Sequence, residues 1–406
     1  MNRRGFLTVA AGVPLAAAGV VTSPAFAAAA PTVSTATPAA DPAFGTATPA
    51  ADPTFGTAAG AASGAAPMRG RVTGLLVRDP VLVRDASAAR LRGFVQPLTW
   101  AEAQPEPGGD LSSPALAKLQ AAADLARQRG YSRLKLRLLA GWQSPGWALA
   151  LGGGPMCKWE DPDAVEPDLY DVPVWWAEDF LAAYSAFLPG LAAALEDEPL
   201  WGEVTVSGTC TVFAEPCVKQ LGVAANRKQA LDRGYTAAAD RAALETVIAV
   251  HHDTFSPMGI TSSVAYNPWQ FIAASGRMET DPAVTVQLMD YQRTTMGAFG
   301  VWENNSLIAR RTGGVLEQTR PDYQGMYDHM ISGAAAGHPI QFQTGTLAKI
   351  QAAGGTAEAT ASWVAEHGGI SVELPRGWEQ DTDAIGVNRA DQLNRQLAVN
   401  AAATLS

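Results

Sequence analysis

The sequence is poor in the residue types that build metal and thiol chemistry. It has 3 cysteines and 5 histidines in 406 residues, and the histidines show no zinc-ligand spacing. It also lacks the Gly-x-Ser-x-Gly elbow of serine hydrolases and a glycine loop followed by Lys-Ser/Thr that would bind phosphate. We therefore expect no metal and no cofactor, and we disfavour a serine hydrolase.

Clusters of positive charge are also missing. The chain has 29 Lys and Arg against 39 Asp and Glu, which gives a formal net charge of −10. This balance argues against nucleic acid and anionic membranes as partners. After the N-terminal segment, no apolar run approaches the roughly 20 residues that span a bilayer. We expect a mature protein that is soluble and makes no membrane contact.

Residues 1–27 have the pattern of an export signal. Arg3 and Arg4 precede an apolar run to Val21, and Ala25-Phe26-Ala27 is typical of a cleavage site. The paired arginines resemble a twin-arginine signal, with an ordinary secretory signal or an uncleaved anchor as alternatives. The segment predicts a secreted, extracellular protein.

Residues 28–68 are rich in Ala, Thr, Pro and Gly, and an 11-residue unit occurs twice, at 35–45 and 46–56. Such a segment buries too little apolar surface to fold, so we interpret it as a disordered linker. The remaining residues, 69–406, suit one (β/α)₈ barrel.

Strand and helix patterns alternate along that domain. Helices are expected at 114–129, 173–195, 232–252, 282–296 and 323–335. Strands are expected at 69–77, 91–100, 134–141, 203–206, 259–269, 297–307, 338–344 and 370–378. This alternation favours a parallel barrel over a sandwich. In such barrels the chemistry lies at the C-terminal ends of the strands.

Two early motifs carry a family resemblance. Trp100 is followed by Gln-Pro-Glu-Pro-Gly at 104–108, and the next strand ends in Ala-Gly-Trp-Gln-Ser-Pro-Gly-Trp at 140–147. This arrangement resembles the early barrel of retaining glycoside hydrolases, in particular β-galactosidase-like members of the (β/α)₈ clan. Gln104 stands where that family has a glutamate.

The resemblance extends to the end of the fourth strand. Ala214-Glu215-Pro216 matches the Asn-Glu-Pro of that clan, with alanine in place of the asparagine that binds a sugar hydroxyl. It implies a secreted glycoside hydrolase that cleaves an oligosaccharide or polysaccharide, with Glu215 as general acid/base.

Glycoside hydrolysis requires a second carboxylate. The clan's nucleophile follows the seventh strand, where this chain has Gln343, which we expect to bind a hydroxyl. Glu303, at the end of the sixth strand, is the favoured nucleophile because amides and a hydroxyl lie next to it in the sequence. Glu373, after the eighth, either attacks or forms a salt bridge to Arg376. The remaining alternative is a non-catalytic carbohydrate-binding barrel.

The chain has 11 tryptophans, and indole faces suit the apolar faces of sugar rings, although tryptophan is also a core residue. Candidate sugar-binding side chains share a position at or just after a strand. They are Trp100, Trp142, Trp147, Asn267, Trp269, Trp302, Asn304, Gln343, Glu373 and Trp378. A third alternative is a structural envelope protein tethered by the linker, which would need no sugar-binding side chains.

The cysteines leave a disulfide open. Cys210 and Cys217 flank Glu215, so a bond between them would fix its loop, whereas Cys157 bonded to either would join two loops. The sequence does not choose between these pairings.

Overall fold

The computed structural model describes residues 67–404, apart from 79, 81–82, 163–167 and 382–383. The predicted export signal and all but the last two residues of the predicted linker lie outside this part of the chain. Within it, no helix is both long enough and apolar enough to cross a membrane.

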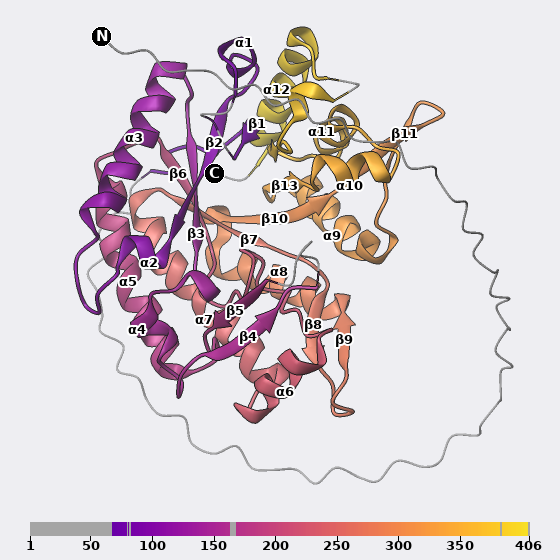
Figure 1. Cartoon of the computed structure of the whole chain (residues 1–406). Helices are drawn as coiled ribbons and strands as arrows, with labels where there is room; N and C mark the ends of the chain where they lie inside the picture. Colours follow the sequence, from indigo (N-terminus) through magenta and orange to yellow (C-terminus); the bar gives the residue numbers. More distant parts are fainter. Residues whose placement is uncertain (1–66, 79, 81–82, 163–167, 382–383, 405–406) are drawn as a thin grey trace, which may run out of the picture. The chain divides into compact units, whose positions relative to one another are not determined.

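Eight parallel strands close into a barrel in the order in which they occur along the chain (Figure 1). They are β1 (Gly74–Val77), β2 (Gly93–Thr99), β3 (Leu134–Leu139), β6 (Trp201–Thr205), β7 (Thr261–Ala265), β10 (Gly300–Leu307), β13 (Ile340–Thr344) and β14 (Ser371–Glu373). The first strand closes against the last, with Leu76 opposite Glu373. The predicted (β/α)₈ fold and the predicted numbering of the strands are confirmed.

Helices cover the outside of the barrel. The longer ones are α3 (Ser113–Arg129), α5 (Glu178–Glu196), α7 (Ala237–Phe255), α8 (Pro282–Met296), α9 (Gln324–Ala335), α11 (Ala357–Glu366) and α12 (Val387–Ala402). Their boundaries follow local signals. The Ser112 side chain caps the first turn of α3, and Gly130, in a left-handed conformation, ends that helix.

The connections that follow the C-terminal ends of the strands are elaborate. The hairpin β4 (Met156–Glu160) and β5 (Leu169–Val172) follows β3. The hairpin β8 (Trp269–Ile272) and β9 (Met278–Asp281) follows β7, and β11 (Ala309–Thr312) and β12 (Val315–Gln318) follow β10. The short helices α2 (Trp100–Ala103), α4 (Gly146–Leu149), α6 (Ala224–Asp232) and α10 (Leu347–Ala352) belong to the same end. The long connections therefore build one face, where barrels keep their sites.

Strand β3 shows how the two sides of the barrel wall differ. Its sequence is Leu-Lys-Leu-Arg-Leu-Leu, and alternate residues of a strand face opposite sides. Leu134, Leu136 and Leu138 belong to the main apolar core between strands and helices. Lys135 and Arg137 point the other way, into the barrel, where both are buried. The barrel interior is therefore strongly polar on this side.

Helix α9 approaches the barrel through a glycine. A Cβ atom added at Gly333 would lie 2.2 Å from the indole of Trp302, whereas one added at Gly325, on the same helix, meets nothing within 4 Å. The close approach of α9 to β10 thus depends on the missing side chain at Gly333.

We predict that Gly333→Ala lowers the free energy of unfolding by about 1–3 kcal/mol through overpacking. Gly325→Ala is the control and should raise it by up to about 1 kcal/mol, because alanine favours a helix. Urea denaturation of both variants measures the difference. Equal stabilities would contradict the tight contact with Trp302.

Candidate active site

A buried ammonium joins two carboxylates inside the barrel. Lys135 Nζ lies 3.1 Å from Glu203 Oε1 and 2.6 Å from Glu303 Oε1. All three side chains are at most 2% exposed. Gln341 donates a hydrogen bond to Glu203 and accepts one from Ser371. Strands β3, β6, β10, β13 and β14 are thus connected by polar contacts through the barrel interior.

A guanidinium forms the next layer towards the C-terminal face. Arg137 binds both carboxylate oxygens of Glu373, at 3.1 and 2.6 Å, and its Nη2 lies 3.6 Å from Glu303 Oε1. Arg78 donates to Glu373 from the other side, with Nε 2.9 Å from Oε1. Burial alone would raise the pKa of Glu373, but Arg137 and Arg78 outweigh it and lower that pKa to about 2. Glu373 is therefore a fully paired carboxylate. Arg376 was the predicted salt-bridge partner of Glu373, and the partners of Glu373 in the structure include Arg137 and Arg78.

Glu215 follows β6 in a loop that buried contacts hold in place. Lys219 donates to the carbonyl oxygen of Thr209 and lies 3.5 Å from Asp240. The Lys219 ammonium also lies 4.5 Å from the ring centroid of Trp175. Since Lys219 and Asp240 are both fully buried, these contacts fix the loop on either side of Glu215.

The environment of Glu215 favours its protonated form. The side chain is half-buried, and burial raises its pKa to about 7 against the opposing effect of Arg137. Asn267 and Arg320 also lower this pKa, whereas the negative charge of Glu303 raises it. Glu215, on the loop at the mouth of the barrel, therefore lies within electrostatic reach of Arg137 and Glu303.

Amides and hydroxyls line the mouth beside Glu215. Asn267, which follows β7, accepts from Tyr323 Oη at 3.0 Å. Its buried amide lies beside the Glu215 carboxyl and lowers the pKa of that group through a side-chain hydrogen bond. Asn304 differs, because it donates to the carbonyl oxygen of Tyr266 and accepts from Tyr327 Oη at 2.9 Å. The Asn267 amide is therefore directed at Glu215, whereas Asn304 is held by Tyr266 and Tyr327.

Three predicted sugar-binding tryptophans lie in the core instead. Trp100 and Trp302 are fully buried, and Trp269 is 2% exposed. Trp100 packs edge-on against Trp147, and Trp302 donates to the carbonyl oxygen of Met289. The prediction that these three side chains contact sugar is not supported by their positions, because a residue at a strand end can face the helices as easily as the mouth.

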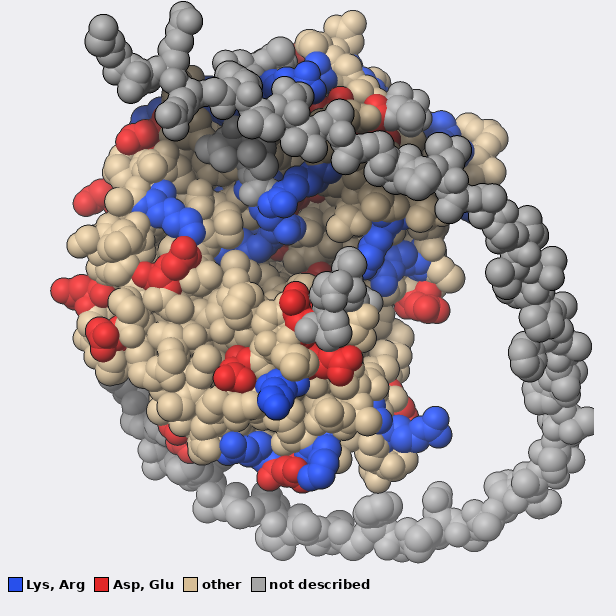
Figure 2. Space-filling view, in the orientation of Figure 1, with Lys and Arg blue, Asp and Glu red and all other residues tan. Residues whose placement is uncertain are grey.

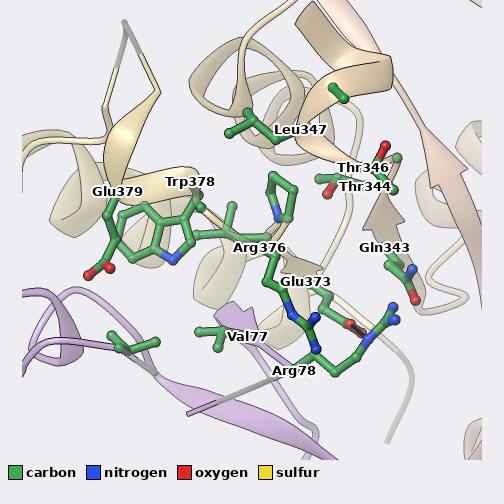
Figure 3. A pocket seen from close by; sticks show the side chains of 16 residues that line it. Val77, Arg78, Gln343, Thr344, Thr346, Leu347, Glu373, Arg376, Trp378 and Glu379 are labelled. Atoms are coloured by element: carbon green, nitrogen blue, oxygen red, sulfur yellow. Dashed lines mark hydrogen bonds and ion pairs between the residues drawn. The ribbon is translucent and has the colours of Figure 1, made fainter. Parts of the chain in front are cut away.

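Other predicted residues do border open space. Trp142 is 38% exposed, and its ring centroid lies 4.9 Å from that of Tyr170. Gln343, Glu373 and Trp378 line a cavity of about 470 Å³ between the ends of β1, β13 and β14 (Figure 3), although Trp378 is as buried as Trp269, at 2% exposed. Glu215 and Glu303 do not line this cavity, and Arg137 links the two places by contacting both Glu303 and Glu373.

The sequence reasoning missed the residues that hold the predicted carboxylates. These are Lys135, Arg137, Glu203 and Arg78. The alternation of leucine with cations in β3 was the available signal, because a strand covered by helices can place polar residues only inside the barrel.

The cysteines are free thiols in this structure. Cys157 is exposed, and Cys210 and Cys217 are buried. Burial is the largest cause that raises the pKa of both buried thiols, in each case to about 12. Over the part of the chain that the structure describes, no cluster of three or more His, Cys, Asp and Glu could hold a metal ion.

Comparison with known proteins identifies no family for this chain. The sequence matches no protein-family model and no curated protein. The structure is similar to the catalytic domain of a β-amylase from Paenibacillus polymyxa, with 9% identity over 84% of this chain and 100% of that one and a TM-score of 0.49. It is also similar to endo-glycoceramidase II from Rhodococcus sp., with 13% identity, 81% and 80% coverage and a TM-score of 0.44.

A further similar structure is the hyperthermophilic β-glucosidase from Pyrococcus furiosus, with 13% identity, 79% and 83% coverage and a TM-score of 0.42. At these identities and scores the likeness carries no inference about activity. The closed parallel barrel of this chain establishes its fold independently. The chain is a (β/α)₈ barrel.

We predict that Lys135→Met lowers the free energy of unfolding by about 3–5 kcal/mol, because it leaves Glu203 and Glu303 buried without their ammonium. Lys228→Met is the control. Lys228 is 75% exposed and pairs with Asp232 on the surface, so its loss should change stability by less than about 1 kcal/mol. Chemical denaturation of both variants tests this, and a Lys135→Met protein as stable as the control would contradict it.

Proposed function

We propose that this chain is a secreted glycoside hydrolase in which Glu215 is the general acid and Glu303 is the second carboxylate. The observation that carries the proposal is the pKa of Glu215, raised to about 7 at the C-terminal mouth of the barrel. A carboxylic acid that keeps its proton near neutral pH can protonate a leaving oxygen.

The two carboxyl groups have opposite surroundings, as glycoside hydrolysis requires. Glu215 is half-buried and destabilised as an anion, whereas Glu303 lies beside Lys135 and Arg137. The fixed negative charge of Glu303 would stabilise an oxocarbenium-like transition state and would help to keep the proton on Glu215.

Glu303 is a better second carboxylate than Glu373 because one of its carboxylate oxygens has no hydrogen-bond partner among the described residues. Glu303 Oε2 has no hydrogen-bond partner among the described residues, whereas Arg137 and Arg78 bind both oxygens of Glu373. We assign Glu373 the role of holding Arg137 and lining the cavity that would receive the sugar.

Asn267 is the proposed sugar-hydroxyl ligand next to Glu215. Its amide is buried beside the Glu215 carboxyl, and Tyr323 donates to its Oδ1. It would supply the contact that Ala214 cannot make.

The second candidate is a non-catalytic carbohydrate-binding barrel. Gln343 at the end of the seventh strand and the 2% exposure of Glu303 favour it, since neither feature suits a nucleophile. Both candidates take an oligosaccharide or polysaccharide, and they differ in turnover.

We predict that Glu215→Gln reduces kcat/KM about 10²–10⁴-fold on a glycan found by a hydrolysis screen, without abolishing binding. For the parent protein, kcat/KM should fall as the pH rises above about 7, because ionised Glu215 has no proton to donate. Glu317→Gln is the control, since Glu317 is 46% exposed on β12.

Undiminished turnover in Glu215→Gln would remove Glu215 from the mechanism. Glycan binding by the parent protein without any turnover would favour the carbohydrate-binding barrel.

Export to the cell exterior is part of the proposal and rests on Arg3, Arg4 and the segment up to Ala27. We expect N-terminal sequencing of the exported protein to begin at Ala28. Changing both arginines to lysine should block export through a twin-arginine route. Normal export of that variant would instead indicate an ordinary secretory signal.

A further inference from the structure

The cavity at the ends of β1, β13 and β14 has one apolar wall and one cationic wall. Val77, Leu347, Pro375 and Trp378 provide apolar surface, and the guanidinium groups of Arg78 and Arg376 lie on the other side (Figure 3). A flat apolar wall beside hydrogen-bonding groups is the usual form of a sugar subsite. The two arginines are more than an uncharged sugar requires.

Arg78 is a second cation on a carboxylate that is already neutralised. Arg137 binds both oxygens of Glu373, and Arg78 adds only an Nε contact. The Arg78 side chain is 44% exposed, and within the described residues it pairs with Glu373 alone. Its two Nη groups are therefore available for a ligand from the cavity.

Glu373 does not neutralise Arg78, because this carboxylate also pairs with Arg137. Glu373 is held as an anion between Arg137 and Arg78. Figure 3 shows Glu379 on the far side of Trp378, away from the guanidinium of Arg78. Basic side chains also border the hollow near the centre of the face in Figure 2. The whole chain carries a formal charge of −10, so any attraction for an anion must come from the basic side chains at the cavity itself.

A buried hydroxyl adds an independent sign of a ligand. Thr344 lines the cavity and is 3% exposed, and its Oγ1 has no hydrogen-bond partner among the described residues. Buried hydroxyls normally have partners, so a ligand that enters the cavity can satisfy this one. Gln343 lines the same side and supplies a further amide.

We propose that this cavity binds a sugar ring that carries a negatively charged substituent, with Arg78 on the anion and with Arg376 and Trp378 in the walls beside the ring. The substituent is the carboxylate of a uronic acid or a sulfate ester, because planar guanidinium groups bind both oxyanions with paired hydrogen bonds. The inference rests on the proposed function for the position of the cavity beside the reacting groups, but binding can be tested without turnover.

The experiment measures binding to matched pairs of ligands by titration calorimetry. Oligogalacturonides are compared with their methyl esters, and a sulfated oligosaccharide is compared with its desulfated form. We expect the charged member of one pair to bind about 10- to 100-fold more tightly, as for a hydrogen bond to a charged group. The pair that shows this preference identifies the substituent. Equal affinity within both pairs would overturn the proposal.

Variants locate the preference. Arg78→Met should reduce it to within about threefold, Arg376→Met should reduce it partly, and Arg78→Lys should retain part of it, because lysine keeps the charge without the paired geometry. Arg241→Met is the control, since Arg241 on α7 pairs with Glu245 and does not line the cavity. Circular dichroism confirms that each variant folds. A full preference in both Arg78→Met and Arg376→Met would overturn the assignment.

The result is separable from the proposed hydrolysis. If the protein prefers the acidic ligand but does not cleave it, the inference about the cavity holds and the proposed hydrolase activity is contradicted. If the protein cleaves neutral glycans and shows no preference for charged ligands, the hydrolase activity is supported and the inference about the cavity is contradicted.

Discussion

The contact of Lys135 with Glu203 and Glu303 is the constraint on which the rest of the site depends. Burying an ion costs several kcal/mol unless a counter-ion and hydrogen bonds compensate, and here one ammonium serves two carboxylates from β6 and β10. Arg137 repeats the arrangement one layer closer to the mouth, between Glu303 and Glu373. Because both cations come from β3, a single strand supplies the positive charge for three acids.

This arrangement gives carboxyl groups of two kinds within one barrel mouth. Glu373 lies in direct contact with two guanidinium groups and is held ionised, with a pKa lowered to about 2. Glu215 stands on the loop after β6, where burial outweighs the more distant attraction of Arg137 and raises its pKa to about 7. Glu373, in contact with the cations, is therefore ionised, whereas Glu215, farther from them, favours its protonated form. A pair of carboxyl groups in these two states is what glycoside hydrolysis requires.

The sequence was sufficient for the barrel and for the strand that carries each candidate, because alternation of strand and helix is a local pattern. Glu303, Gln343 and Glu373 lie on the sixth, seventh and eighth strands as predicted. The partners of the carboxylates were not predictable in the same way, since they depend on which side of the wall a side chain faces. Trp302 was misassigned for that reason, because it packs outward against α9.

The alternating sequence of β3 also bears on how the chain finds its register. Sliding this strand by one residue would exchange its two faces, placing Leu136 in the barrel and Lys135 among the helices. The first change would leave the acids of β6 and β10 without counter-ions, and the second would bury an ammonium in hydrocarbon. A barrel closed with β3 shifted by one residue would therefore be destabilised both in its interior and in the core between strands and helices. The charges inside the barrel therefore also act as a check on correct assembly.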